Sequence, residues 1–247
     1  MIVDAHCHID EIPALGWSMP ARLLIERLDE AGIQMGVVLS IADVPNLNPQ
    51  ALDTIELAMQ RYPGRLVKFA RIHPWYGERS MAYLDDAIGR RGMKGLKLHP
   101  TSSIAHPADE WSTRLIRRAA EYGAPTLFHC GDDPLTTPLA VAKAAERCPE
   151  ATILAGHMGG YFHGEAMLEV AERLPNLVLE TSAMPYPDLI RRAVDLLGAE
   201  RVVFGSDGPA GHPKLEVLKV QLAGLSATDE ALVLGGNMER ILGQVRA

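Results

Sequence analysis

The chain has 247 residues, of which 47% are hydrophobic, so it is long enough to bury a large core as one α/β barrel or as two small domains. Its 24 Lys and Arg residues against 31 Asp and Glu residues give a net charge of −7, which argues against a nucleic-acid partner because no overall basic field attracts phosphate. No signal-peptide pattern and no run of ~20 apolar residues is present, so we expect a cytoplasmic protein without membrane contact.

Short apolar runs alternate with longer runs of helical period along the whole chain. The predicted strands are residues 2–9, 35–42, 65–73, 95–99, 124–130, 152–158, 177–183 and 201–207. The predicted helices are residues 21–32, 49–62, 80–91, 109–123, 138–148, 164–174, 188–198 and 213–225, with start signals at Asn48, Ser80 and Thr137. Because no linker or low-complexity stretch interrupts this order, we expect one domain over residues 1–247.

Eight strand–helix units in strict alternation are typical of a (β/α)8 TIM barrel of about 250 residues. The strands are apolar throughout, which suits parallel strands covered on both faces. A doubly wound sheet is the alternative, but that fold more often has a Gly-rich phosphate loop where this chain has His6 and His8. Residues 227–243 are predicted to add two short C-terminal helices, with a cap at Asn237, that pack across one end of the barrel.

Polar side chains gather where the predicted strands end, which is where barrel enzymes place their chemistry. Six of the nine histidines lie at these positions. The strand-end groups are His6, His8, His73, Lys97, His99, His129, His157 and Asp207. Packing alone does not readily explain this distribution, so it predicts a polar site at one end of the barrel.

The spacing of the first two histidines predicts their direction. Residues i and i+2 of a strand share a face, so His6 and His8 point together and Cys7 points the other way, against the helices. Asp4 is then expected on the histidine face, where it orients a ligand imidazole or forms another buried hydrogen bond. The three cysteines lack CxxC spacing, so we expect reduced core residues.

The side chains of His6, His8, His129 and Asp207 are predicted to converge near the barrel axis as a nitrogen and oxygen ligand set for one divalent metal ion. Zinc is the preferred assignment, with manganese, iron and cobalt as alternatives. Such a metal would lower the pKa of a bound water from about 15.7 towards 7 and so supply a hydroxide nucleophile. Asp207 would take the proton, and His157 would polarise a substrate carbonyl or move the proton.

Four further strand-end residues are candidates for substrate binding: Arg71, His73, Lys97 and His99. Arg71 could hold a substrate carboxylate through two parallel hydrogen bonds, with an ion pair to a barrel acid as the alternative. His73 and His99 each precede a proline, so capping a turn explains them equally well.

The motifs VDAHCHI, GLKLHP, LFHCG, LAGHMGG, VVFGSDGP and LGGNMERILG, taken together, resemble the metal-dependent amidohydrolase superfamily. The resemblance covers the whole chain and is to the amidohydrolase-2 branch related to aminocarboxymuconate-semialdehyde decarboxylase. It implies a mononuclear site with His6, His8, His129 and Asp207 as ligands and His157 as the catalytic histidine.

The resemblance also bears on Lys97. Other branches use a carboxylated lysine on the fourth strand to bridge two metals, but this branch generally does not. Lys97 is therefore expected to provide a positive charge near the substrate or to partner Asp207. Some relatives, the pyrone-dicarboxylate lactonases, keep most of these residues and hydrolyse without a metal.

We therefore predict a metal-dependent hydrolase that cleaves a C–N or C–O bond of a small amide, lactone or ester. A metal-dependent decarboxylase or hydratase of a small carboxylic acid is the alternative. A TatD-like nuclease, which has a glutamate where this chain has Lys97 and His99, and a non-catalytic ligand-binding barrel are less favoured. The expected partner is a small-molecule substrate, and barrels of this size often pair as homodimers.

Overall fold

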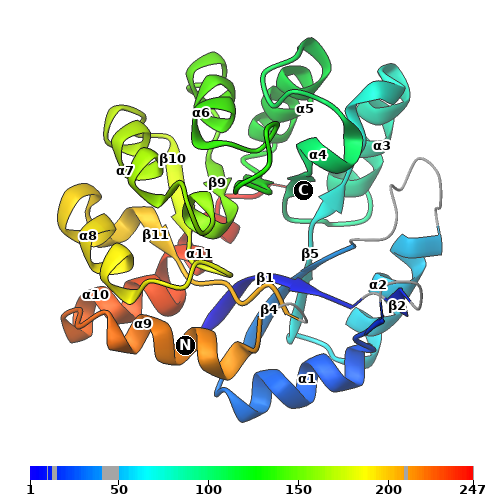
Figure 1. Ribbon diagram of the computed structural model, residues 1–247. Coiled ribbons are helices and arrows are strands. Elements are labelled where there is room, and N and C mark those ends of the chain that lie inside the picture. The colour runs from blue at the N-terminus through cyan, green and yellow to red at the C-terminus, as the bar shows by residue number, and fades with distance from the viewer. Residues whose placement is uncertain (10, 13–15, 41–49, 209–210, 247) are drawn as a thin grey trace.

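The computed structural model describes all residues except 10, 13–15, 41–49, 209–210 and 247, and it shows strands surrounded by helices (Figure 1). The parallel strands are β1 (Val3–His8), β4 (Met35–Leu39), β5 (Leu66–Lys68), β6 (Ala70–Arg71), β7 (Leu96–Leu98), β8 (Thr126–Phe128), β9 (Ile153–Ala155), β10 (Leu177–Glu180) and β11 (Val202–Val203). A short antiparallel hairpin, β2 (Glu11–Ile12) and β3 (Trp17–Ser18), follows β1.

The strands close into a barrel. The order β1-β4-β5 continues into β6-β7-β8-β9-β10-β11, because β5 and β6 are two pieces of one predicted strand that separate at Phe69. At the seam, the Ala5 amide donates to the Phe204 carbonyl at 2.9 Å and the His8 amide donates to the Gly208 carbonyl at 2.8 Å. These bonds place β1 beside β11, and the prediction of a TIM barrel is confirmed.

The outer layer consists of α1 (Ala21–Glu30), α2 (Gln50–Arg61), α3 (Glu78–Gly89), α5 (Glu110–Glu121), α6 (Pro138–Arg147), α7 (Gly164–Arg173), α8 (Pro187–Leu197) and α9 (Pro213–Leu222), with the short α4 (Pro100–Ser103) after β7. Thr137 caps α6 as predicted, since its side chain accepts from the Ala140 amide. The start predicted at Ser80 is wrong, because its hydroxyl donates to the His73 carbonyl and α3 begins earlier, at Glu78. The start predicted at Asn48 lies outside the described residues.

The inner face of the barrel carries its own hydrophobic cluster. It contains Val3, Ala5, Val37, Leu39, Phe69, Leu127, Leu154, Val178 and Val203. The opposite faces of the strands pack with the helices in a second cluster, which includes Cys7. The predicted outward direction of Cys7 is therefore confirmed.

A β-bulge in β1 changes which residues face inward. Asp4 pairs with Gly36 and Cys7 pairs with Val38, so β1 has one more residue than β4 between these two pairs. Val3 and Ala5 point inward before the bulge, whereas His6 and His8 point inward after it.

The bulge also explains why one expectation for Asp4 is wrong. Asp4 does not share the face of His6, and its Oδ1 atom accepts instead from the backbone amides of His6 at 3.0 Å and Ser206 at 2.9 Å. The carboxyl group is fully buried, and burial raises its pKa to about 7. Asp4 thus ties the backbone of β1 to the segment after β11, which is the second of the two roles considered.

The C-terminal segment forms a continuous helical run through α10 (Ala227–Ala231), the π-helix η5 (Leu232–Gly236) and α11 (Asn237–Leu242). The predicted cap at Asn237 is wrong, because its backbone is helical and its buried side chain donates to the carbonyls of Ala199 at 2.7 Å and Val202 at 2.9 Å. Met238 and Ile241 belong to the inner cluster, so this segment packs across one end of the barrel as predicted.

Among the helices in the described ranges, none combines the length and the apolar character that a membrane crossing needs.

Candidate active site

The ends of β1 and β11 bring three predicted ligands together. Nε2 of His8 lies 3.1 Å from Oδ1 of Asp207, and Nε2 of His6 lies 3.4 Å from the same oxygen. One donor atom from each of the three side chains lies within 4.8 Å of the other two. The bulge in β1 makes this convergence possible, since it turns both imidazoles into the barrel.

Hydrogen bonding shows that this cluster suits a cation. Nδ1 of His8 lies 3.0 Å from the Leu39 carbonyl, which can only accept, so Nδ1 carries a hydrogen and Nε2 is the atom left to bind a metal. Burial raises the pKa of the Asp207 carboxyl, but the electrostatic interactions with His6 and His8 hold that pKa well below its usual range. Two imidazole nitrogens and a carboxylate oxygen form a donor set that fits a divalent metal ion.

Lys97 lies beside this cluster on β7. Its Nζ atom is 3.0 Å from Nε2 of His6, and burial lowers its pKa to about 7 while Asp207 partly opposes that shift. Burial, followed by the charge on Lys97, lowers the pKa of His6 to about 4. His6 is therefore a neutral imidazole at pH 7, as a metal ligand must be.

His129 and His157 form a separate pair that faces the same space. Nε2 of His157 lies 3.0 Å from Nδ1 of His129, and His99 stacks on His129 with the ring centroids 4.1 Å apart. Burial lowers the pKa of His129, and it lowers the pKa of His99 to about 3. Within the described residues, His129 is not part of the group of three side chains whose donor atoms lie within 4.8 Å of one another, and a metal-binding role for His129 stays a prediction.

The backbone at three of these strand ends lies in the left-handed region. His157 has φ 66°, Ala183 has φ 53° and Asp207 has φ 52°. A residue with a side chain loses roughly 1–3 kcal/mol in such a conformation, and this kind of strain clusters at functional sites. The surrounding hydrogen bonds maintain it, including the one from the Asp207 amide to the His6 carbonyl at 2.7 Å.

The other substrate-binding candidates have contacts of their own. Arg71 is buried and donates to the Ser40 carbonyl at 3.0 Å and to the Ser102 hydroxyl at 2.7 Å. His73 accepts from the Trp75 amide at 3.3 Å, and His99 accepts from the Ser102 amide at 3.4 Å. Both histidines therefore cap turns. His99 also stacks on His129, which is a predicted metal ligand.

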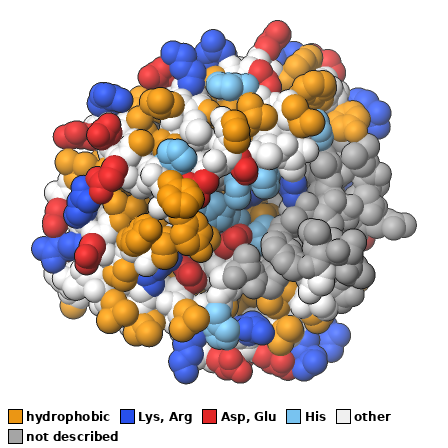
Figure 2. Space-filling model, in the orientation of Figure 1, with side chains coloured by type: hydrophobic (Ala, Val, Ile, Leu, Met, Phe, Trp, Pro, Cys, Tyr) orange, Lys and Arg blue, Asp and Glu red, His pale blue; other side chains and the backbone are white. Residues whose placement is uncertain are grey.

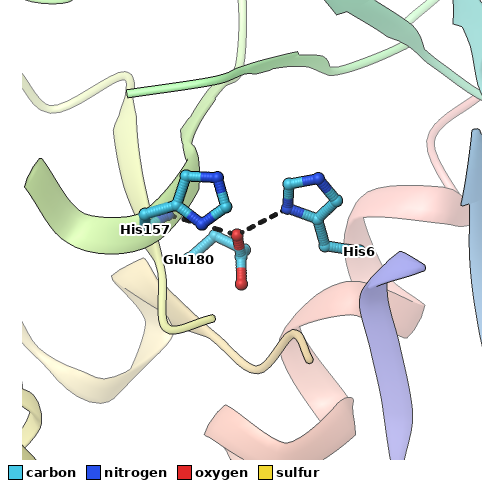
Figure 3. A group of neighbouring side chains, drawn as sticks. All are labelled: His6, His157 and Glu180. Carbon is cyan, nitrogen blue, oxygen red and sulfur yellow. Dashed lines mark hydrogen bonds and ion pairs between the residues drawn. The ribbon is translucent and has the colours of Figure 1, made fainter. Parts of the chain in front are cut away.

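Glu180, at the end of β10, is a residue that the sequence reasoning left out because its direction was ambiguous. Its side chain is fully buried and lies between His6 and His157 (Figure 3). Burial raises the pKa of Glu180, but the hydrogen bond with His6 and the one from the Ser182 amide help to bring it to about 2. The sequence did carry a signal for Glu180, because it is an acid in an otherwise apolar strand. Buried carboxylates are almost always paired, so such an acid is expected to have a partner in the site.

The family comparison agrees with this geometry. A family model described as Amidohydrolase, of the Amidohydro_2 type, matches residues 3–244. The chain belongs to the amidohydrolase-2 family. No curated protein matches it.

Solved structures match this chain over almost its full length. They include an uncharacterised TIM-barrel protein from Bordetella bronchiseptica, with TM-score 0.82, 19% identity and 98% of each chain covered. They also include 2,6-dihydroxybenzoate decarboxylase from Rhizobium, with TM-score 0.78, 13% identity and 98% of each chain covered. A dihydroxybenzoic acid decarboxylase from Polaromonas, with bound manganese and the inhibitor 2-nitroresorcinol, has TM-score 0.78, 15% identity and 100% and 98% of the chains covered. At these identities the matches show the shared fold.

A cavity of about 230 Å³ opens beside the site. Its lining residues are His129, Gly131, Asp132, Asp133, His157, Gly160, Tyr161, Ala183 and Asp207. Figure 2 shows histidine side chains in a central hollow, with hydrophobic side chains beside it. Asp132 fixes one wall, because its carboxylate accepts from the amides of Tyr161 at 3.0 Å and Phe162 at 3.1 Å.

Proposed function

We propose that this protein is a metal-dependent decarboxylase. Its proposed substrate is a small carboxylic acid whose carboxylate is carried on a single hydroxylated aromatic ring. The observation that carries the proposal is the clustering of the donor atoms of His6, His8 and Asp207 beside the hydrogen-bonded pair of His129 and His157. The names of two of the structurally similar proteins support decarboxylation over the hydrolysis first predicted from the sequence.

The size of the cavity supports a small substrate. Its volume of about 230 Å³ lies below the roughly 300–1,000 Å³ of common ligand pockets. Tyr161 contributes an aromatic ring to the lining, and aromatic rings pack favourably against one another.

His6, His8 and Asp207 would hold the metal, with His129 as the further predicted ligand. A divalent ion there supplies positive charge for the carboxylate and hydroxyl oxygens of the substrate. Zinc and manganese both accept these donors, and the bound manganese in the Polaromonas enzyme supports testing manganese first.

Decarboxylation needs one proton at a defined place. The bond between the ring carbon and the carboxylate breaks, carbon dioxide leaves, and a proton is added to that carbon. The hydrogen bond between Nε2 of His157 and Nδ1 of His129 holds a proton at the cavity wall, where Asp207 also lies. His157 and Asp207 can therefore exchange a proton with the reacting carbon and recover it from water.

The test is an assay of the protein loaded with Mn²⁺ or Zn²⁺, on a panel of hydroxybenzoates, lactones and amides. Carbon dioxide release is expected only from the acids, and in D₂O one deuterium should appear at the carbon that lost the carboxylate. Asp207→Asn and His157→Asn are expected to lower kcat by at least about 100-fold, the scale of general acid–base catalysis. Glu172→Gln, on the exposed surface, is the control. Turnover of lactones or amides alone would instead support hydrolysis.

A further inference from the structure

The Glu180 carboxylate accepts four hydrogen bonds inside the barrel. Its Oε2 atom accepts from Nδ1 of His6 at 3.0 Å, from the Ser182 hydroxyl at 2.8 Å and from the His157 amide at 3.3 Å. Its Oε1 atom accepts from the Ser182 amide at 2.6 Å. Figure 3 shows the carboxylate between the rings of His6 and His157.

The contact with His6 fixes one tautomer. A carboxylate can only accept, so the hydrogen of neutral His6 is on Nδ1 and its lone pair is on Nε2. Nε2 is the atom that lies 3.4 Å from Asp207 in the predicted metal cluster. Glu180 therefore directs Nε2 of His6 toward the metal ligands, where Nζ of Lys97 also lies 3.0 Å from it.

The contact with Ser182 fixes a second tautomer. The Ser182 hydroxyl gives its hydrogen to Glu180, so the same oxygen can only accept from Nδ1 of His157, which is 3.0 Å away. The Ser182 carbonyl, 3.3 Å from that nitrogen, also requires a hydrogen there. His157 then presents a lone pair at Nε2 and accepts from Nδ1 of His129, which leaves the lone pair of His129 on its Nε2 atom.

We propose that Glu180 is a positioning residue that sets the tautomers of His6 and His157 together, through a direct bond and through Ser182. The proposal deepens the proposed function, because it assigns the lone pairs that a metal and a moving proton would use. Such outer partners fix the ring orientation of metal-binding histidines and raise their basicity.

A competing explanation is that Glu180, His6 and His157 themselves bind a cation, since their donor atoms also lie within 4.8 Å. The hydrogen bonds argue against it. Oε2 of Glu180 already has three donors within 3.3 Å, and Nδ1 of His6 carries a hydrogen toward it. The lone pair of His6 lies on the other side of its ring, toward Asp207 and Lys97.

The first test uses the wild-type protein without metal. Long-range ¹H–¹⁵N NMR spectra at pH 7.5 distinguish the two tautomers of each histidine, with resonances assigned from His6→Gln and His157→Gln variants. We expect the Nδ1–H form for both His6 and His157. The Nε2–H form at His6, or a mixture of both forms, would overturn the proposal.

The second test uses calorimetric titration of Mn²⁺ to separate the direct effect of Glu180 on His6 from its effect on His157 through Ser182. Glu180→Gln is expected to weaken Mn²⁺ binding by roughly 10–100-fold, the usual effect of losing such a partner. Ser182→Ala should leave Mn²⁺ affinity within about threefold. It should raise the share of the Nε2–H form at His157 alone, because only the longer contact of Nδ1 with the backbone carbonyl of residue 182, at 3.3 Å, would still favour the Nδ1–H form. Glu172→Gln, which lies on the surface, should change neither quantity.

Unchanged Mn²⁺ affinity in folded Glu180→Gln would contradict the role in metal binding. If that variant does not fold, Ser182→Ala and the wild-type tautomers still decide the question. Neither measurement uses a substrate, so failure of the decarboxylase proposal would be seen separately, in the turnover assay.

Discussion

Gly205 follows β11 at a point where the backbone must pass very close to Glu180. A Cβ atom at this position would lie 2.1 Å from Oε1 of Glu180 and 3.1 Å from Cβ of His6. Real Cβ atoms essentially never approach another atom as closely as the first distance. The Glu180 carboxylate can therefore occupy its position only because residue 205 has no side chain.

Gly205→Ala should consequently disturb the site as well as the fold. We expect a loss of about 1–3 kcal/mol in the free energy of unfolding, the usual effect of overpacking, because the alanine must displace Glu180. Urea unfolding measures this loss. Gly208→Ala is the matched control, since the nearest atom to its Cβ would be 3.4 Å away. Equal effects of the two substitutions would contradict this account.

The candidate site shows what sequence patterns capture at single residues. The i, i+2 rule correctly placed His6 and His8 on one face, because the bulge lies before them. The same rule failed for Asp4, since an extra residue in a strand leaves no mark in the pattern of residue types. Glu180 was missed because its direction depends on the register of β10, which the apolar pattern did not fix.

Among the elements, the segment after β9 depends on a residue from the loop after β8. Asp132 accepts from the amides of Tyr161 and Phe162, and Oδ1 also lies 3.0 Å from Nδ1 of His163. Phe162 is 84% exposed and Tyr161 is 56% exposed, so little packing holds them in place. These hydrogen bonds therefore keep the aromatic wall of the cavity in position.

Asp132→Ala should loosen this wall without touching the metal cluster. We expect KM for an aromatic acid to rise about tenfold while kcat changes less than threefold. The reason is that each hydrogen bond to a charged group stabilises the folded segment by roughly 1.5–3 kcal/mol, and the substitution removes these bonds. Steady-state kinetics measures both constants. Glu172→Gln, on the exposed surface away from the cavity lining, is the control. A fall in kcat with constant KM would show that Asp132 acts on the chemistry instead.

The C-terminal helices depend on Asn237 in a comparable way. We expect Asn237→Ala to lower the free energy of unfolding by about 2–4 kcal/mol, because the carbonyls of Ala199 and Val202 lose a buried donor. Chemical denaturation followed by circular dichroism measures the change. Glu239→Ala, on the exposed side of α11, should stay within about 0.5 kcal/mol of the wild type. Similar losses in both variants would point to the helix itself.

The order of the strands and helices could be predicted better than the residues at which they begin and end. Alternating apolar and helical runs predicted the barrel, and residues 65–73 were predicted as one strand that the structure divides into β5 and β6 at Phe69. Asn237 was predicted as a helix cap because asparagine favours that role. In the structure its side-chain amide donates instead to carbonyls of η4 (Ala199–Arg201) and β11. Such contacts between distant segments leave little trace in a local pattern.

For the whole molecule, the concentration of buried neutral histidines links stability to pH. The pKa of His6 is lowered to about 4 and that of His99 to about 3, and burial also lowers the pKa of His129. In the unfolded chain each imidazole binds a proton near pH 6.5. Between pH 6.5 and about 4, the unfolded state therefore holds protons that the folded state does not, and stability falls as the pH falls.

The metal-free protein should thus be less stable at pH 5 than at pH 6.5. Each of the three imidazoles contributes up to roughly 1.4 kcal/mol per pH unit, and Asp4, with its raised pKa of about 7, opposes one of them. Urea midpoints at the two pH values give the measurement. His99→Asn should reduce the difference by about one imidazole, and a midpoint that does not depend on pH would contradict the argument.

The bulge in β1 has a consequence for the transfer of the site to another barrel. If all the residues of β1 paired regularly with β4, without the bulge, Cys7 would take an inward position and both imidazoles would point into the helix layer. Grafting residues 3–8 onto another barrel therefore requires copying the irregular pairing along with the two histidines.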